Sequence, residues 1–584
     1  MTEHDEGVRG TSARAGRNGR RRFLAGAGGA MAAPILLGPL VRSARAQSAD
    51  GQSVVVKTTH GQVRGVRNGG VVVFKGIPYA GSPAGEGRFK APPKLAPWTG
   101  VRDALVYGPQ AIQPPDTGWP KEWTPAASSE DCLVLNVWTQ GTGDGRKRPV
   151  MFYSHGGGFA TGNGGAEVWP QTLHHDGAAL ARNQDVVVVT HNHRLGLLGY
   201  LYLGDLLGEE YAASGAAGML DIAAALEWVR DNIEAFGGDP GTVMIWGESG
   251  GGAKTGTLTA MPRAHGLFHR ASIESGPTLR LTPREAATET ARRVLAGLGL
   301  GEKKARELVK LPVERLRTLQ QEMSGTNPMM VGPVVDGHHI PTHPYDPVAP
   351  ALSADVPLIV GTNKDESIMF LQRGDLAAFS LDEASLRERL KARFGDKAER
   401  VLEVHRRGRP GASPTDLFIA IGTGQWMWHG AITLAERKAA LKAAPVFMYQ
   451  FAYESEVPVA PSVPYPTKAA HAMEIAFKFD HPETSPEAGR RPERFRAAKN
   501  MSAAWAAFAR TGNPSHPAIP TWPPYDTVRR ATMVLDAECR VVDDPYREER
   551  LLWDELGPEP GPPRAGRSSV EEGLRAVDAA VHPL

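Results

Sequence analysis

Two kinds of apolar pattern alternate along most of the chain. Short apolar runs rich in β-branched residues are typical of buried strands, and apolar residues every three to four positions are typical of helices. The runs that qualify as strands are residues 149–154, 186–190, 242–246, 271–274, 356–361 and 446–451. Residues 221–235 and 252–261 have the character of helices. Strands that alternate with helices predict an α/β protein with a mostly parallel central sheet.

The two ends of the chain depart from this pattern. Three short runs, at 53–56, 61–66 and 71–76, are separated by turn residues, which predicts antiparallel strands ahead of the parallel sheet. Residues 557–584 open with a Pro/Gly-rich stretch and are expected to form a loose tail with a short helix at 570–581. We therefore expect one large domain over residues 47–556.

Residues 1–46 have the composition of a targeting segment. Arg20-Arg21-Arg22-Phe23-Leu24 precedes a Gly-rich, weakly apolar stretch, and Ala44-Arg45-Ala46 has the small residues that a signal peptidase recognises. The paired arginines resemble a twin-arginine export signal, with an ordinary secretory signal or an N-terminal anchor as alternatives. Glycine and two prolines make the stretch a poor membrane span. We expect a bacterial protein that the twin-arginine machinery exports, periplasmic or secreted, without a stable membrane anchor.

Composition and charge narrow the class of protein. Of 584 residues, 41% are hydrophobic and 22% charged, as in an ordinary globular protein. The net charge is +2, but residues 1–46 hold eight arginines and three acids, so the rest carries −3 and gives no case for nucleic acid. Two cysteines cannot make a disulfide scaffold. His174-His175 and His191-Asn192-His193 are interpreted as surface and strand-end histidines, and we expect neither a metal nor a cofactor.

The most informative local sequence is Gly247-Glu248-Ser249-Gly250-Gly251, between a predicted strand and a predicted helix. Strand, G-x-S-x-G and helix together make a serine nucleophilic. The tight turn strains the serine backbone, the glycines remove clashing Cβ atoms, and free N–H groups of the helix face the hydroxyl. In a chain with 66 glycines the pattern also arises by chance as a plain turn. A phosphate loop is excluded because Ala253 stands where lysine must follow Gly252.

Further informative stretches are spread along the chain. They are FKGIPYA (74–80), EDCLVLNVW (130–138), HGGGF (155–159), HRLGLLGYL (193–201), ALEWVRDNIEAFGGDP (225–240), GESGGG (247–252), PVVDG (333–337), GTNKDES (361–367), HAMEIAF (471–477) and WPPYD (522–526). Taken together, they resemble the type-B carboxylesterases, the α/β-hydrolase family that includes para-nitrobenzyl esterases and cholinesterases. The resemblance extends from about residue 53 to 550. It implies an α/β-hydrolase fold, with a large mostly parallel sheet flanked by helices and with long loop and helical insertions over the active site.

The resemblance implies a catalytic triad of Ser249, Glu366 and His471, in the chain order of α/β-hydrolases. In such a triad the histidine takes the serine proton and the acid holds the imidazole in the right tautomer. The residues alone do not choose between Asp365 and Glu366, and the resemblance selects Glu366. The stretch around His471 matches the family pattern of the catalytic histidine.

An oxyanion hole and a substrate pocket are implied by the same resemblance. The loop His155-Gly156-Gly157-Gly158 brings backbone N–H groups close to a substrate, and the expected donors are Gly157, Gly158 and Gly250. The family often has alanine at position 250, and glycine there is expected to change little. The resemblance also places Glu248 and Ser275 near the triad. The expected pocket residues are Phe159, Trp426, Met427 and Trp428, with core packing as the alternative for the last three.

Two departures from the family pattern stand out. The family cysteine at position 132 pairs with an earlier one, but none precedes Cys132, and a pair with Cys539 is not expected. Ser214-Gly215-Ala216 replaces Ser-Gly-Asn, so one loop hydrogen bond is expected to be lost.

The function that the sequence predicts is a serine carboxylesterase that forms an acyl-enzyme on Ser249. The alternatives are a specialised lipase, amidase, carbamate or thioester hydrolase on the same triad, and a non-catalytic cholinesterase-like binding protein. The oligomeric state and the ester substrate stay open.

Overall fold

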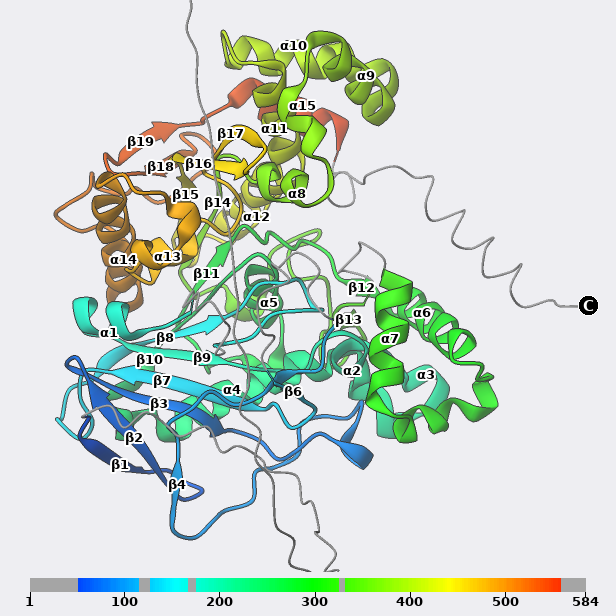
Figure 1. Ribbon diagram of the computed structural model, residues 1–584, viewed down its shortest axis with the longest axis vertical. Coiled ribbons are helices and arrows are strands. Elements are labelled where there is room, and N and C mark those ends of the chain that lie inside the picture. Colours follow the sequence, from blue (N-terminus) through cyan, green and yellow to red (C-terminus); the bar gives the residue numbers. More distant parts are fainter. Residues whose placement is uncertain (1–50, 115–126, 166–174, 325–330, 558–584) are drawn as a thin grey trace, which may run out of the picture. The chain divides into compact units, whose positions relative to one another are not determined.

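A sheet of 13 strands forms the centre of the computed structural model, which describes residues 51–114, 127–165, 175–324 and 331–557 (Figure 1). Its order is β1-β2-β3-β7-β9-β8-β10-β11-β14-β15-β18-β19, with β4 beside β2. The strands are β1 (Ser53–Lys57), β2 (Gln62–Asn68), β3 (Val71–Pro78), β4 (Val101–Asp103), β7 (Val134–Thr139), β8 (Arg148–Ser154), β9 (Val187–His191), β10 (Gly238–Glu248), β11 (Arg270–Glu274), β14 (Leu358–Asn363), β15 (Val446–Phe451), β18 (Ala531–Leu535) and β19 (Arg540–Asp543).

The middle of the sheet is parallel. Every neighbouring pair from β9–β8 to β15–β18 is parallel, whereas β1, β2, β3, β7 and β19 join through antiparallel pairs. The predicted mostly parallel sheet is therefore confirmed. Three two-stranded sheets lie outside it, formed by β5 (Gln110–Ala111) with β6 (Ser128–Ser129), β12 (Thr282–Pro283) with β13 (Val334–Val335), and β16 (Ser455–Ala460) with β17 (Val463–Lys468).

Helices cover both faces of the sheet, because successive side chains of a strand point to opposite faces. On β8, Val150 and Phe152 join the core on the side of α4 and α5, and Met151 and Tyr153 join the core on the side of α1 and α14. The helices are α1 (Ala178–Gln184), α2 (Gly196–Tyr200), α3 (Gly204–Leu207), α4 (Ala217–Asn232), α5 (Gly250–Leu258), α6 (Arg284–Gly297), α7 (Val313–Ser324), α8 (Ser367–Gly374), α9 (Glu383–Phe394), α10 (Ala398–Gly408), α11 (Pro414–Thr423), α12 (His429–Ala439), α13 (Glu474–Lys478), α14 (Glu493–Thr511) and α15 (Arg547–Leu556).

The predicted elements are present, with shifts at their ends. The run at 242–246 is the middle of β10, which starts earlier because Gly238 pairs with Arg148 of β8 across an irregularity. The helix predicted at 221–235 is α4, and a 3₁₀ turn at Ile233–Phe236 takes over where α4 ends. The antiparallel strands predicted at 53–76 are β1, β2 and β3.

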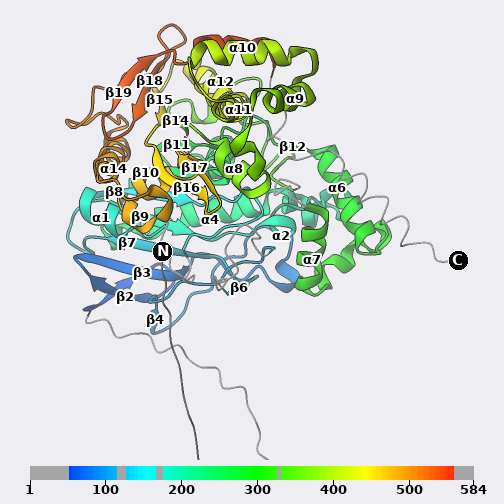
Figure 2. The same cartoon turned by 45° about the horizontal axis from the view of Figure 1, so that its top comes forward.

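Two groups of helices are inserted between strands of the sheet. In the chain, α6 and α7 lie between β11 and β14, and α8 to α12 lie between β14 and β15. Figure 1 shows α6 and α7 together on one side of the molecule, and Figure 2 shows α9, α10 and α11 together at its upper end. The helical insertions expected from the sequence are therefore present.

Two of the predictions lie outside the described residues: the export signal at 1–46 and the short helix at 570–581. The last described helix, α15, ends at Leu556. No helix within the described ranges is both long enough and apolar enough to cross a membrane.

Candidate active site

Ser249 occupies a strained turn at the junction of β10 and α5. Its backbone has φ 56° and ψ −122°, a conformation that non-glycine residues rarely adopt. Its N–H donates to the carbonyl of Glu274 at the end of β11, over 2.8 Å, and its own carbonyl accepts from Ala253 N over 3.0 Å. The serine is thus the N-cap residue of α5, with its side chain half-buried at the carboxyl edge of the parallel strands.

Three glycines make room for this turn. A Cβ at Gly247 would lie 2.5 Å from the carbonyl oxygen of Ser154, and one at Gly251 would lie 2.0 Å from the same oxygen. A Cβ at Gly276 would lie 2.1 Å from the carbonyl oxygen of Ser249 itself. The turn therefore fits only because glycines, which have no side chain, stand where it approaches the backbone of β8 and of the loop after β11.

His471 and Glu366 lie in direct contact, although 105 positions separate them. Glu366 follows β14 as the N-cap residue of α8, and His471 lies between β17 and α13. The distance from His471 Nδ1 to Glu366 Oε2 is 2.5 Å, and both side chains are at most 1% exposed. The other carboxylate oxygen of Glu366 accepts Asn363 N over 2.7 Å. A carboxylate at Nδ1 favours the tautomer that carries its proton on this nitrogen.

The structure also decides between the two adjacent acids. Asp365 Oδ2 accepts the N–H of Ala469 over 3.3 Å. Burial raises its pKa to about 6, against the opposing effect of Lys364 and Lys468. Glu366, and not Asp365, is the acid that contacts His471.

Glu248 lies on the opposite side of the same imidazole. Its Oε1 is 3.1 Å from His471 Nε2, close enough for an ion pair but without hydrogen-bond alignment. Burial raises the pKa of Glu248 to about 8. Burial also opposes the charged form of His471, but Glu248 and Glu366 outweigh it and raise the pKa of His471 to about 9. Two carboxylates therefore favour the imidazolium.

The glycine loop after β8 lies against the serine turn. Gly157 and Gly158 have φ of +83° and +60°. A Cβ at Gly156 would lie 3.5 Å from the Cβ of Ser249, and one at Gly250 would lie 2.4 Å from Gly158 N and 2.2 Å from Gly158 O. The three expected oxyanion donors thus come from two segments in contact. Glycine at position 250 has a steric role that the sequence did not suggest, because it permits this approach.

A model of the carboxylesterase family matches residues 52–553. The chain belongs to the carboxylesterase family. It is 36% identical over 514 residues to the para-nitrobenzyl esterase of Bacillus subtilis, covering 85% of this chain and 97% of that protein. It is 34% identical over 517 residues to the phenmedipham hydrolase of Pseudarthrobacter oxydans, covering 85% and 98%. The crystal structure of carboxylesterase EST55 from Geobacillus stearothermophilus matches with a TM-score of 0.74 at 38% identity, over 85% of this chain and 99% of that chain.

These likenesses confirm the family and the α/β-hydrolase fold inferred from the sequence motifs. Ester hydrolysis is the activity that the family name carries. The likenesses do not assign individual residues. Within the described residues the Ser249 hydroxyl makes no hydrogen bond to His471, whose ring nitrogens contact Glu366 and Glu248.

The residues expected in the pocket separate into two groups. Met427 and Trp428 are 3% exposed, and Trp428 packs edge-on against Tyr546, so both belong to the core. Phe159 is also buried, and its ring meets that of Tyr200 at 5.2 Å. Trp426 is only half-buried, in a π-helical stretch of the kind often found at functional sites.

Phe370, which the sequence did not single out, lies between Trp426 and His471. Its ring centroid lies 4.9 Å from that of Trp426 and 4.9 Å from that of His471. It comes one helical turn after Glu366 on α8. That spacing is the signal that could have found it, because residues four apart share one face of a helix.

A chain of buried polar contacts runs from Glu366 into the core. Asn363 donates through Nδ2 to Glu474 Oε2 over 2.6 Å, and Lys478 donates to Glu474 Oε1 over 3.0 Å. Lys478 also bonds to Glu274. Trp505 Nε1 and Ser272 Oγ donate to the other oxygen of Glu274, over 2.6 and 2.7 Å. These contacts fix the carboxyl ends of β11 and β14 relative to α13.

The remaining sequence expectations concern single residues. Ser275 follows β11 in a left-handed conformation, φ 47°, and its N–H donates to Gly361 O over 2.9 Å. Ser214 keeps a loop bond, since its Oγ accepts Leu203 N over 2.7 Å. Cys132 and Cys539 are both free thiols, as expected. No group of three or more His, Cys, Asp or Glu residues within the described ranges could hold a metal ion.

The packing of the serine turn predicts that Gly251→Ala removes most activity. The new Cβ would meet backbone, which cannot rotate away, so Ser249 must shift. We expect kcat to fall by about 100-fold or more, as a misplacement of about 1 Å can cost. Gly256→Ala on the same helix is the matched control, because its Cβ would meet only Ile273 and Tyr345 side chains at 3.5 and 3.8 Å. Equal activity of the two variants would contradict the steric argument.

The contact of Glu248 with His471 predicts a shift in pH dependence. Only the neutral imidazole can act as base, so activity is lost as pH falls through the pKa of His471. Glu248→Gln removes one of the two anions that raise this pKa. We expect the acid limb of the kcat/KM profile to move to lower pH by about one unit. The exposed Glu234→Gln is the control, and an unmoved limb in Glu248→Gln would refute the electrostatic coupling.

Proposed function

We propose that the protein is a serine carboxylesterase whose nucleophile is Ser249 and whose base and acid are His471 and Glu366. The observation that carries the proposal is the buried contact of 2.5 Å between His471 and Glu366. This contact lies at the same edge of the sheet as the strained serine turn. Glu248, the residue next to Ser249, touches the same imidazole. Membership of the carboxylesterase family supports the reaction class.

In the acylation half-reaction, His471 Nε2 takes the proton of Ser249 as the oxygen attacks the ester carbonyl. The oxyanion that forms is bound by the N–H groups of Gly157, Gly158 and Gly250. The protonated imidazole then gives its proton to the alcohol as the C–O bond breaks. Glu366 keeps the ring oriented and stabilises the imidazolium, without itself taking the proton.

In the second half-reaction, water repeats the cycle on the acyl-enzyme. His471 deprotonates the water, the same donors bind the second oxyanion, and Ser249 leaves with the proton that the imidazole returns. The product is a carboxylic acid. Each step uses only groups of this chain, the ester and water.

Substrate selectivity depends on the groups that border the imidazole. Phe370 and Trp426 place aromatic surface next to His471. Relatives of the chain are named for different substrates, including a para-nitrobenzyl esterase, a phenmedipham hydrolase and a fumonisin B1 esterase. A chain-length series of p-nitrophenyl esters, with acetanilide as the amide, separates a general carboxylesterase from a lipase or an amidase.

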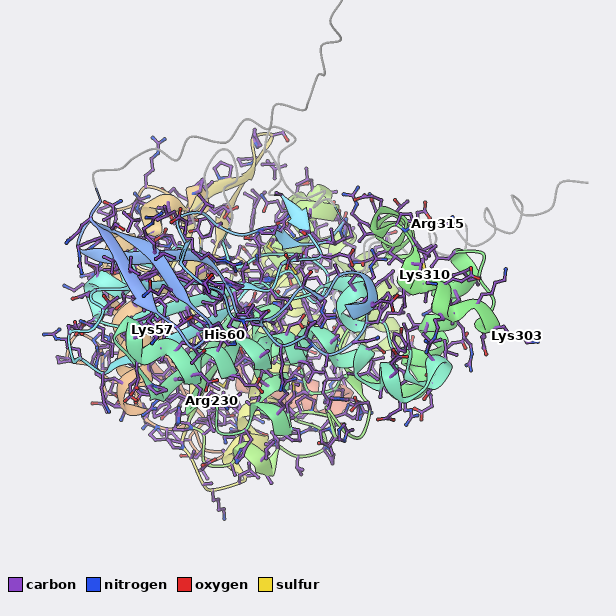
Figure 3. The ribbon with its side chains drawn as sticks, turned by 90° about the horizontal axis from the view of Figure 1, so that it is seen from below. Lys57, His60, Arg230, Lys303, Lys310 and Arg315 are labelled. Atoms are coloured by element: carbon purple, nitrogen blue, oxygen red, sulfur yellow. The ribbon has the colours of Figure 1, made fainter. Side chains whose placement is uncertain are left out.

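We propose a small-molecule ester, and not a nucleic acid, as the partner of this chain. Arg230 pairs with Asp231 over 2.7 Å, so its charge is compensated. Figure 3 shows the labelled basic side chains of one face in two separate groups, Lys57, His60 and Arg230 in one and Lys303, Lys310 and Arg315 in the other.

Replacement of the nucleophile tests the proposal directly. Ser249→Ala is expected to lower kcat for p-nitrophenyl acetate by about six orders of magnitude, the cost seen when a triad nucleophile is removed. Thermal unfolding confirms that the variant is folded. An organophosphonate should label the wild-type protein at Ser249, located by peptide mass spectrometry. Near-native turnover by the folded variant, or labelling at another serine, would refute the assignment, and a complete lack of labelling would favour a non-catalytic binding protein.

We also propose that the twin-arginine machinery exports the chain to the periplasm or the medium. Arg20 and Arg21 support this, because they precede Phe23-Leu24 with one residue between. In the full chain, Arg20→Lys with Arg21→Lys should keep esterase activity in the cytoplasmic fraction. Arg14→Lys with Arg17→Lys is the charge-matched control and should be exported normally. Export that is unaffected by the first pair would exclude this route.

A further inference from the structure

Lys254 is a fully buried lysine on α5, the helix that starts at the proposed nucleophile. Its side chain has no exposed surface, and within the described residues it makes no ion pair with a carboxylate. Burial alone lowers its pKa to about 7. Burying an ammonium group without a counter-ion is costly, so such a residue is a candidate for a functional role.

The ammonium group of Lys254 holds the root of the glycine loop. Its Nζ donates to the carbonyl oxygen of His155 over 2.8 Å. His155 is the first residue after β8, directly before the three loop glycines. The His155 ring contacts the carbonyl oxygen of Gly156 through Nδ1 over 2.9 Å. Two successive carbonyls at the start of the loop are therefore held in place.

In the part of the chain that the structure describes, no carboxylate pairs with Lys254. Buried histidines 155, 191 and 193 lie around it, with ring centroids 4.8 Å apart for His155–His193 and 5.3 Å for His191–His193. Burial, followed by the charge of Lys254, lowers the pKa of each of the three histidines. The ring of Phe159 lies 6.0 Å from Nζ. The hydrogen bond of the ammonium group is thus directed at the loop backbone.

We propose that Lys254 is a positioning residue that sets the oxyanion loop against the nucleophile helix. This inference rests on the proposed function. One helix carries Ser249 at its N-cap, Gly250 at its first position, and Lys254 one turn later on the side that meets the loop. The bond from Lys254 to His155 joins that helix to the segment that carries Gly157 and Gly158. It fixes the distance between the donors of the two segments.

The consequence is specific to the transition state. An ester binds as a neutral carbonyl, and the donors matter most when negative charge develops on its oxygen. A loop that is free to move would bind substrate almost as well but would stabilise the oxyanion less. Loss of the lysine bond should therefore lower kcat and leave KM nearly unchanged. A lysine that merely stabilises the fold would change the melting temperature without this selective effect.

The test is Lys254→Met, which keeps the length of the side chain and removes the donor. We expect kcat for p-nitrophenyl acetate to fall by about 100-fold, in the range of a lost oxyanion donor, with KM within about threefold. A trifluoromethyl ketone, which forms a hemiketal oxyanion on the serine, should bind about 100-fold more weakly. Lys254→Arg keeps a charged donor and should recover part of kcat. Lys254→Leu replaces the methionine variant if the latter does not fold.

Lys438 provides the matched control. It is also buried, and its Nζ donates to backbone carbonyls, those of Ser353 and Ala354, over 2.5 and 3.0 Å. Lys438→Met should lower the melting temperature and leave kcat and ketone affinity unchanged. The proposal is wrong if a folded Lys254→Met or Lys254→Leu keeps wild-type kcat, or if KM alone rises. A wild-type protein without esterase activity would instead refute the proposed function, so the two failures are distinguishable.

Discussion

The left-handed backbone of Ser249 is the constraint on which the rest of the active site depends. A non-glycine residue in such a conformation costs about 1–3 kcal/mol and persists only where its surroundings over-determine it. Here β11 binds the serine N–H, α5 binds its carbonyl, and the carbonyl of Ser154 on β8 fills the space beside Gly247 and Gly251. Because β8, β10 and β11 are parallel neighbours, this turn, the glycine loop and the Glu274 network all meet at one edge of the sheet.

Features that depend on local sequence could be predicted. The apolar runs marked the central strands because a strand buried on both faces needs consecutive apolar residues. The serine turn could be predicted because the glycines that it requires for steric reasons, Gly247 and Gly251, lie within two residues of Ser249 in the sequence. Strand ends could not be predicted as well. For example, β10 starts at Gly238 because this residue pairs with Arg148 of β8, which lies far away in the sequence.

Features that depend on distant packing could not be predicted from the residues alone. Asp365 and Glu366 are adjacent and chemically alike, and only the position of the loop carrying His471 decides which one reaches the imidazole. The tryptophans at 426 and 428 belong to one aromatic stretch, but a π-helical turn sends one toward Phe370 and the other into the core. The contact of Glu248 with His471 depends on how the loop carrying His471 packs against the serine turn, so the family resemblance placed Glu248 near the triad without indicating this contact.

The charge balance around His471 sets opposing demands on the base. Four carboxylates are buried together, those of Glu248, Glu274, Glu366 and Glu474, and Lys478 bonds to two of them. Glu366 and Glu248 are left facing one imidazole, on opposite nitrogens. Two anions stabilise the imidazolium that forms during acyl transfer, which favours the transition state. They also stabilise the imidazolium of the resting protein, which cannot accept a proton from serine.

Burial resolves part of this conflict. Because burial raises the pKa of Glu248 to about 8, this carboxylate takes up a proton more easily than an exposed one. A protonated Glu248 no longer favours the imidazolium, so the loss of a proton from His471 becomes easier. Because Glu248 Oε1 lies 3.1 Å from His471 Nε2, the charge of each group affects the protonation of the other, and the pH at which the base becomes available depends on both residues. Glu248 thereby takes part in the protonation equilibrium of the site, in addition to lying next to the proposed nucleophile.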